Sequence, residues 1–151
     1  MLSYKGSIKS ATLTFVIVIS AGLSSMPAFA QTASTFQKSC NDIKYGVDKE
    51  GTPVVMASCL KKDGKTRQQT AAALRGFSNN EGRLTAGPGV STFQKTCKDM
   101  KVETKDAHVH VSATCKKTSG EWVPASTILY DVNNIDGELR HRVAGNDKVV
   151  M

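Results

Sequence analysis

The sequence lacks the motifs by which most enzymes are recognised. It contains no nucleophile elbow, no phosphate-binding loop and no zinc-binding helix motif. Asp131, Asp136 and Glu138 lie close together in the sequence, but a glycosidase needs two carboxylates that face each other across a cleft. Strand alternation places Asp136 and Glu138 around a tight turn instead. We therefore predict that the protein is not an enzyme and needs no cofactor.

Long apolar runs are scarce as well, and a content of 40% apolar and 22% charged residues is typical of neither a disordered tail nor a membrane protein. One apolar stretch, Ala11–Leu23, follows Lys5 and Lys9 and precedes Ala28-Phe29-Ala30. It is short and contains Ser, Thr and Gly, which makes it a poor membrane span. This pattern predicts a secretory signal peptide over residues 1–30, with an uncleaved anchor as the alternative. We expect a secreted or periplasmic protein with no membrane span after cleavage.

Acidic residues are fewer than basic ones, with 13 Asp and Glu against 20 Lys and Arg and a net charge of +7. Lys5 and Lys9 belong to the predicted signal peptide, so its removal lowers the net charge to +5. This mild excess does not by itself call for a nucleic-acid partner, and we expect none. The length of 151 residues allows one domain, or two very small ones.

Four cysteines follow the predicted cleavage site: Cys40, Cys59, Cys97 and Cys115. An even number of cysteines in a small exported domain indicates two disulfides, because such a domain has little apolar core of its own. Four cysteines allow three pairings, and composition does not choose among them.

An internal repeat favours one of these pairings. Ser34–Cys40 recurs as Ser91–Cys97, 57 positions later, and Asn79–Leu84 matches Asn134–Leu139 at an offset of 55. The second cysteines of the two copies are offset by 56 positions. The economical pairing is therefore within each copy, as Cys40–Cys59 and Cys97–Cys115. Each bridge would close a loop of about 20 residues and stabilise the fold by about 3 kcal/mol.

Alternation of apolar and polar residues predicts a mostly β structure. His108–Cys115 alternates strictly, and Val54–Leu60 is its counterpart in the first copy. Thr127–Val132 is the next strand candidate, and Asp136-Gly137 is typical of a tight hairpin turn because both central positions need positive φ. Glu81-Gly82 suits the same turn less well. The first copy is the weaker β former, and Ala71-Ala72-Ala73 allows a helical turn there.

The repeat also divides the chain. We expect a domain over residues 31–143, with repeat one at 34–90 and repeat two at 91–143, followed by a loosely ordered tail at 144–151. Gly87-Pro88-Gly89 is predicted to be a linker that would permit exchange of halves between chains, so the protein is expected to be a monomer or a swapped dimer. Phe36 and Phe93 are predicted core anchors, and Trp122 is expected to pack partly buried.

The ordered set of motifs resembles the cyanovirin-N homology family. A signal peptide precedes two F-x-x-(S/T)-C copies, each with a second cysteine under twenty residues on and an N-x-(D/E)-G-x-L ending. The resemblance covers about Thr35 to Arg142. It implies an all-β, single, elongated and pseudo-symmetric domain in which each half mixes strands of both intertwined repeats. It also implies a lectin for mannose-rich oligosaccharides, on glycoproteins or cell surfaces, that needs no metal.

The resemblance implies two sugar sites, one at each end of the domain. Each would combine the start of one repeat, the residues after its second cysteine, and the Asn-x-Asp-Gly turn of the other repeat. At the first site these positions are Thr35, Lys38, Ser39, Lys61, Lys62, Asn134 and Asp136. At the second site they are Thr92, Lys95, Thr96, Lys116, Lys117, Thr118, Asn79 and Glu81. Leu60 stands where family members can carry an acid, and the intact turn at Asn134 and Asp136 makes the first site the stronger candidate.

Simpler interpretations of the same residues exist. Asn134, Asp136 and Gly137 are also what a turn alone requires, because Asn and Asp side chains cap their own backbone. His108 and His110 share a strand face, but no third metal ligand is evident nearby, so no metal site is expected. His141 has no obvious partner and is expected to be exposed.

The sequence therefore predicts an exported carbohydrate-binding lectin that recognises mannose-rich oligosaccharides through shallow polar sites. The alternative is a non-lectin interaction module on the same scaffold, which would bind a protein or a polyanion through its basic loops. The lysine pairs Lys61-Lys62 and Lys116-Lys117 favour that alternative, and ionic binding of this kind would be released by salt.

Overall fold

A computed structural model describes residues 31–142. The predicted signal peptide and the tail at 144–151 lie outside the described residues, as does Val143. The described chain consists of ten β-strands and two short 3₁₀ helices, which confirms the all-β prediction. The first repeat supplies η1 (Phe36–Lys38), β1 (Cys40–Val47), β2 (Pro53–Leu60), β3 (Arg67–Ala73), β4 (Arg75–Asn80) and β5 (Arg83–Val90). The second supplies η2 (Phe93–Lys95), β6 (Cys97–Lys105), β7 (His108–Lys116), β8 (Trp122–Ile128), β9 (Val132–Ile135) and β10 (Glu138–His141).

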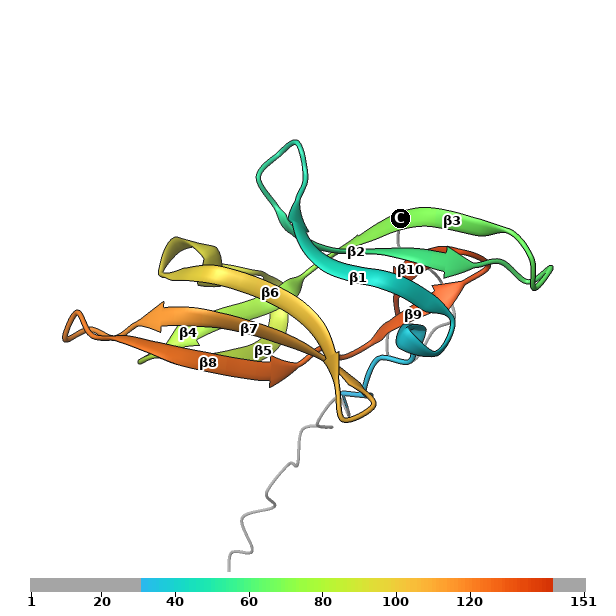
Figure 1. The fold of residues 1–151 in the computed structure, drawn as a ribbon. Helices are drawn as coiled ribbons and strands as arrows, with labels where there is room; N and C mark the ends of the chain where they lie inside the picture. Colours follow the sequence, from blue (N-terminus) through green and yellow to red (C-terminus); the bar gives the residue numbers. More distant parts are fainter. Residues whose placement is uncertain (1–30, 143–151) are drawn as a thin grey trace, which may run out of the picture.

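The strands form two similar halves, each built from both repeats. In one half the antiparallel sheet β1-β2-β3 of the first repeat packs with the β9-β10 hairpin of the second. In the other half the sheet β6-β7-β8 packs with the β4-β5 hairpin of the first repeat. Figure 1 shows the two groups side by side along an elongated molecule. The predicted intertwining of the repeats is thus confirmed.

The two halves match in detail, down to their irregularities. Cys40 pairs with Cys59 across β1 and β2, and Cys97 pairs with Cys115 across β6 and β7. Both pairs are disulfides, as predicted from the repeat. A bulge follows the first cysteine of each copy. Asp42 lies in the first bulge and Asp99 in the second, both with positive φ.

Both halves contribute to one apolar core. Phe36 and Phe93 are fully buried, as expected of anchors. Alternate residues of β7, from Val109 to Cys115, face the same core, because successive side chains of a strand point to opposite faces. The predicted pattern of this strand is confirmed. Within the described residues no helix is long and apolar enough to cross a membrane.

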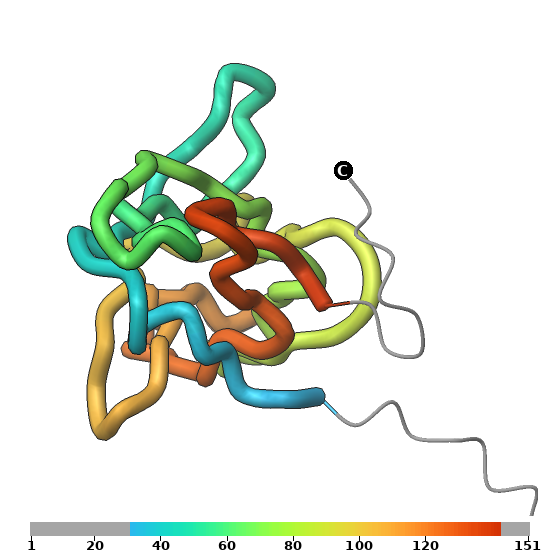
Figure 2. Tube along the Cα trace, turned by 90° about the vertical axis from the view of Figure 1, so that its right-hand side faces the viewer, coloured from blue at the N-terminus to red at the C-terminus, as the bar shows by residue number. Residues whose placement is uncertain are grey.

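A buried serine at the start of each repeat joins it to the other repeat. Ser34 accepts a hydrogen bond from the Val132 amide through Oγ, at 3.0 Å, and its own amide donates to the Leu129 carbonyl. In the second repeat, Ser91 Oγ accepts from the Phe77 amide at 2.9 Å, and the Ser91 hydroxyl donates to the Leu74 carbonyl. Figure 2 shows the consequence for the first repeat, whose blue N-terminal segment runs beside the red C-terminal segment.

Three local predictions were wrong. The expected strand Thr127–Val132 is split, because Asp131 has φ +59° and turns the chain between β8 and β9. Ala71-Ala72-Ala73 belongs to β3, where pairing with β2 overrides the helix propensity of alanine. Gly87-Pro88-Gly89 lies within β5, where these three residues form an irregularity opposite the single residue Gly76, and is not a free linker.

The hairpin turns that close β9-β10 and β4-β5 have the expected geometry. Asp136 and Gly137 have φ of +53° and +89°, and Glu81 and Gly82 have φ of +50° and +80°. Such pairs match the twist of a two-residue hairpin loop. Each turn therefore projects its acidic side chain at one end of the molecule.

Candidate functional site

At the first end, a turn of the second repeat is fastened to the first repeat by one amide. The Asn134 Nδ2 group donates to the Ser39 hydroxyl at 2.8 Å and to the Leu60 carbonyl at 2.9 Å. Its Oδ1 accepts from the Gly137 amide at 2.8 Å. Both N–H groups of Asn134 and its oxygen are thus engaged within the protein. The side chain of Asn134 holds the site together, and it has no free donor for a ligand.

We call the three hydrogen bonds of Asn134 to Ser39, Leu60 and Gly137 the clamp of the first end. Asp136 lies next to this clamp, and part of its carboxylate is available to a ligand. Its Oδ1 accepts from the Lys62 amide at 2.9 Å. Among the described residues, none donates a hydrogen bond to its Oδ2, and the residue is exposed. The aliphatic part of Lys61 packs over Gly137, where an added Cβ would lie 2.8 Å from Lys61 Cγ. The arrangement presents an exposed carboxylate oxygen and a lysine at the rim of the turn.

The second end repeats the same clamp with the roles of the repeats exchanged. The Asn79 Nδ2 group donates to Thr96 Oγ1 at 3.0 Å and to the Lys116 carbonyl at 2.8 Å, and its Oδ1 accepts from the Gly82 amide at 2.8 Å. Lys117 packs over Gly82 as Lys61 does over Gly137. The sequence repeat is therefore also a repeat of hydrogen-bonding geometry.

The two ends differ in how much of the acidic side chain is free. Both carboxylate oxygens of Glu81 accept from the Thr118 amide at 3.3 Å, and the Thr118 hydroxyl also donates to Glu81. The longer glutamate side chain folds back onto the loop after β7, whereas the shorter Asp136 engages its loop through one oxygen. The first end therefore presents the more accessible acceptor.

The remaining predicted site residues differ in whether their side chains lie near the clamps. Thr35, Lys38, Thr92 and Lys95 are exposed around η1 and η2, close to the clamps, and Thr35 Oγ1 donates to Asn133 at 2.6 Å. The side chain of Lys116, by contrast, lies over the Trp122 ring on another face, and only its backbone carbonyl takes part in the clamp. Lys117 forms an ion pair with Glu121 at 2.7 Å.

Asp63 shapes the loop at the first end, although no sequence motif pointed to it. Its carboxylate accepts from the Thr66 hydroxyl at 2.5 Å and from the amides of Lys65 and Thr66 at 2.9 and 2.8 Å. These hydrogen bonds, with that of the Thr66 hydroxyl the most important, lower the pKa of Asp63 to about 2. The loop that carries Lys61 and Lys62 is therefore braced by a side chain that stays ionised.

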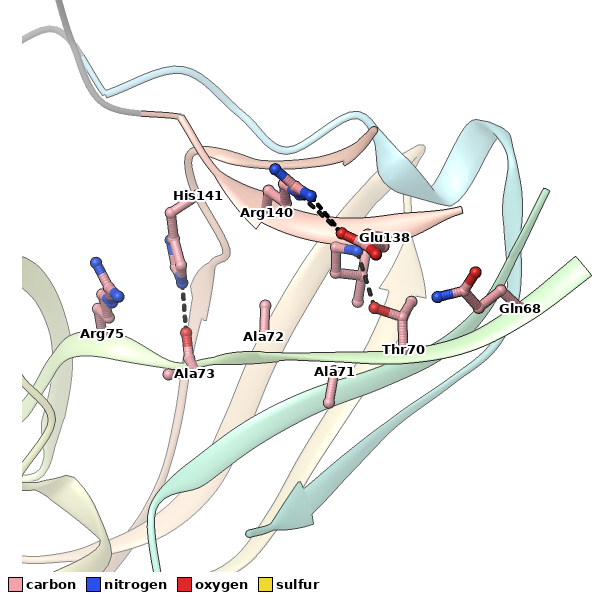
Figure 3. Close-up of a pocket in the computed structure, with 10 residues that line it drawn as sticks. Gln68, Thr70, Ala71, Ala72, Ala73, Arg75, Glu138, Arg140 and His141 are labelled. Carbon is pink, nitrogen blue, oxygen red and sulfur yellow. Dashed lines mark hydrogen bonds and ion pairs between the residues drawn. The ribbon is translucent and has the colours of Figure 1, made fainter. Parts of the chain in front are cut away.

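A polar groove continues from the first end along the contact of β3 with β10 (Figure 3). Its volume is about 340 Å³, and Gln68, Thr70, Glu138 and Arg140 line the part nearest the turn. Thr70 Oγ1 accepts from the Leu139 amide at 3.0 Å, and Glu138 pairs with Arg140 at 2.5 Å. This groove was not predicted, because it depends on which strands of the two repeats meet.

His141 closes the far part of the groove and is not exposed, contrary to expectation. Its Nε2 lies 2.5 Å from the Ala73 carbonyl, and the ring is largely buried between β10 and β3 (Figure 3). Burial lowers the pKa of His141, and nearby Arg75 lowers it further, against the opposing effect of the Ala73 carbonyl. Within residues 31–142, no group of three or more His, Cys, Asp or Glu could hold a metal ion, and His108 and His110 lack a third ligand there.

The fold and the two ends define a class: a disulfide-bonded β domain of two intertwined repeats with a polar site at each end. The family model of the CVNH domain matches residues 36–140. The chain therefore belongs to the cyanovirin-N homology family.

Solved structures agree with this assignment. Microvirin, solved as a complex with mannobiose, is 27% identical, with 72% of this chain and 99% of that chain covered and a TM-score of 0.54. The CVNH protein of N. crassa is 20% identical, with coverage of 72% and 99% and a TM-score of 0.56. A MoCVNH3 variant, solved with (N-GlcNAc)4, is 19% identical, with coverage of 75% and 100% and a TM-score of 0.55. No protein of curated function matches the sequence significantly.

Proposed function

We propose that the protein is an exported lectin that binds mannose-rich oligosaccharides through its two ends and does no chemistry on them. The observation that carries the proposal is the repeated clamp. At each end an asparagine of one repeat fixes an acidic turn against the hydroxyl-bearing start and the lysine-bearing loop of the other. Such convergence of acceptors and donors suits adjacent sugar hydroxyls, each of which both donates and accepts.

At the first end, Asp136 is the proposed principal ligand. Its exposed Oδ2 is placed to accept from a sugar hydroxyl, while Oδ1 is held by the Lys62 amide. The Ser39 hydroxyl accepts from Asn134 and keeps its own proton to donate. Lys61 and Lys38 can donate from the rim. Asn134 is proposed as a positioning residue, because its amide is fully engaged.

The second end is proposed to bind more weakly. Glu81 is occupied by Thr118, so a sugar hydroxyl has to compete with a contact inside the protein. Thr96 keeps a hydroxyl proton, as Ser39 does at the first end, and Lys95 and Lys117 remain near the rim. Two unequal sites on one rigid body can still raise the apparent affinity for a branched glycan by about 10²–10⁴.

The comparison with microvirin supports a mannose-type ligand, since that protein was solved with mannobiose at 27% identity. The MoCVNH3 variant was solved with a GlcNAc oligomer, so sugars other than mannose belong in any test. The groove along β3 and β10 offers room for a further sugar of a longer glycan. Gln68 lines this groove and also lies against Gly137 of the turn, so a sugar chain bound at the first end could continue into the groove.

Retention on immobilised mannan tests the proposal. We expect the protein to bind and to be released by free mannose oligomers, but not by salt alone, because neutral hydroxyl contacts are not screened. Asp136→Asn keeps the turn, since asparagine also tolerates positive φ, and should weaken the first end about tenfold. Glu50→Gln, on the distant β1-β2 hairpin, is the matched control and should bind normally.

The outcomes separate the proposal from its rival. Loss of retention in the combined Asp136→Asn and Glu81→Gln variant, with an unchanged melting temperature, supports binding at the two ends. Release by salt alone would instead favour the module that binds a protein or a polyanion through its basic loops. Turnover of the glycan would contradict the assignment as a non-enzyme.

A further inference from the structure

The second half of the molecule has an outer sheet face that the two end sites do not use. This face consists of the solvent-facing side chains of β6, β7 and β8, where Lys98 lies beside Thr114 and Lys101 beside Ser112. Lys116, at the end of the central strand β7, pairs with Trp122 at the start of the edge strand β8. Four exposed lysines, Lys98, Lys101, Lys105 and Lys116, lie on these strands with two exposed acids, Glu103 and, in the bulge of β6, Asp99.

Trp122 is exposed on this face, contrary to the expected packing role. It keeps 43% of its surface accessible. The Lys98 ammonium lies 4.5 Å from the centre of its ring and that of Lys116 lies 5.8 Å away, both within the range of a cation–π contact. Both ammonium groups therefore lie beside the same exposed indole.

A shallow hollow extends along the same face away from Trp122. It has a volume of about 540 Å³ and is lined by the hydroxyls of Ser112 and Ser126, by His110 and Tyr130, and by two side chains of opposite charge, Lys105 and Glu103. From Trp122 to Ile128 the strand rises roughly 20 Å, at about 3.3 Å per residue. The face thus combines a cationic end with a hydroxyl-lined floor of a length that suits a chain of sugars.

The fold does not require these residues, because the other half lacks them. By register, the counterparts of Lys98, Lys116 and Trp122 are Asn41, Leu60 and Arg67. The Arg67 guanidinium is engaged with Asn41 and with the Ser58 carbonyl. Met56 and Ala71 replace the hydroxyls of Ser112 and Ser126. The cationic, hydroxyl-lined character belongs to one half alone.

We propose that this outer face binds an acidic polysaccharide, a sugar chain that carries carboxylate or sulfate groups. One acidic group would lie between the Lys98 and Lys116 ammonium groups, which donate charge-assisted hydrogen bonds to it. The neutral hydroxyls of the chain would lie over Ser112 and Ser126. A sugar chain fits better than a nucleic acid, because Lys98 already covers the indole on which a base would stack. The site is independent of the two end sites.

Trp122 provides a direct test, since it is the single tryptophan of the chain. Its fluorescence is titrated with polygalacturonate, which carries carboxylates, and with dextran sulfate, which carries sulfates. Neutral dextran and mannobiose serve as uncharged probes. We expect saturable changes with one or both acidic polymers, at most small changes with the neutral sugars, and strong weakening when salt is raised from about 50 to about 500 mM.

Variants assign the response to the face. Lys98→Gln combined with Lys116→Gln should weaken binding about tenfold or more, because two charge-assisted contacts are lost. Lys44→Gln is the matched control: it removes one lysine from the corresponding face of β1 in the other half and should leave the titration unchanged. The double variant should still bind mannan through the first end, to which neither lysine belongs, and this separates the proposal from the proposed function.

Several results would overturn the proposal. Absence of any fluorescence change with both acidic polymers would do so, as would an equal affinity in the double lysine variant. An equally tight response to duplex DNA at the same salt would show general attraction of polyanions in place of a polysaccharide site.

Discussion

Asn134→Ala perturbs the clamp at the first end, and the structure sets the size of its effect. The substitution removes the two donated bonds to Ser39 and Leu60 and the one accepted from Gly137. A hydrogen bond contributes about 1 kcal/mol net, so the loss of three, at a half-buried position, should cost about 2–3 kcal/mol. For a domain of this size the melting temperature should fall by about 10 °C.

The clamp also predicts where binding is lost. Because Asn134 holds the Asp136 turn against the Lys62 loop, its removal should weaken sugar binding at the first end and spare the second. Thermal unfolding by circular dichroism and titration with mannobiose measure the two effects. Asn80→Ala is the matched control, since Asn80 is an exposed residue of the equivalent turn and should change stability by less than about 0.5 kcal/mol.

Unfolding of Asn134→Ala at the wild-type temperature would contradict this role of Asn134. A loss of stability in Asn80→Ala as large as that in Asn134→Ala would contradict it as well. Either result would mean that the three hydrogen bonds do not hold the repeats together at this end.

Three further perturbations test other parts of the structure. Burial lowers the folded-state pKa of His141, so its contribution to stability should be complete above its ordinary pKa of about 6.5 and should decline as pH falls below that value. The free energy of denaturant unfolding should therefore be smaller at pH 5.5 than at pH 8, and His141→Gln should reduce this difference. Replacing Cys97 and Cys115 together with alanine should lower the free energy of unfolding by about 3 kcal/mol, because the disulfide closes a loop with a sequence separation of 18. Urea unfolding measures this loss, and a loss below about 1 kcal/mol would contradict the prediction. Gly76→Ala should prevent folding, because the added Cβ would lie 1.5 Å from the Gly87 carbonyl oxygen. Gly51→Ala adds its Cβ in open space and should lower the free energy of unfolding by only about 1 kcal/mol. Soluble expression and thermal melts compare the two variants.

Features that rest on local sequence could be predicted. The repeat gave the disulfide pairing, because two cysteines at nearly equal spacing in each copy have one economical arrangement. The turn at Asp136-Gly137 followed from the need for positive φ, and the buried face of β7 followed from strict alternation. The family resemblance supplied the intertwined arrangement of the repeats.

Features that depend on tertiary partners could not be predicted. The resemblance placed Asn134 and Ser39 at one site, but nothing local in the sequence shows the hydrogen bonds of Asn134 to Ser39 and Leu60, since these residues come from the other repeat. The exposure of Trp122 depends on its pairing with Lys116 across β7 and β8, and the burial of His141 on the contact of β10 with β3. Ala71-Ala72-Ala73 misled because strand pairing outweighs the helix propensity of alanine.

Sugar recognition by the two ends can be followed through the backbone amide shifts of isotope-labelled protein in an NMR titration with mannobiose. We expect saturable shifts at the Lys62 and Gly137 amides of the first end, and weaker ones at the Thr118 and Gly82 amides of the second. Shifts confined to residues away from both ends, or none with mannobiose or a GlcNAc oligomer at millimolar concentration, would contradict sugar recognition by the clamped turns.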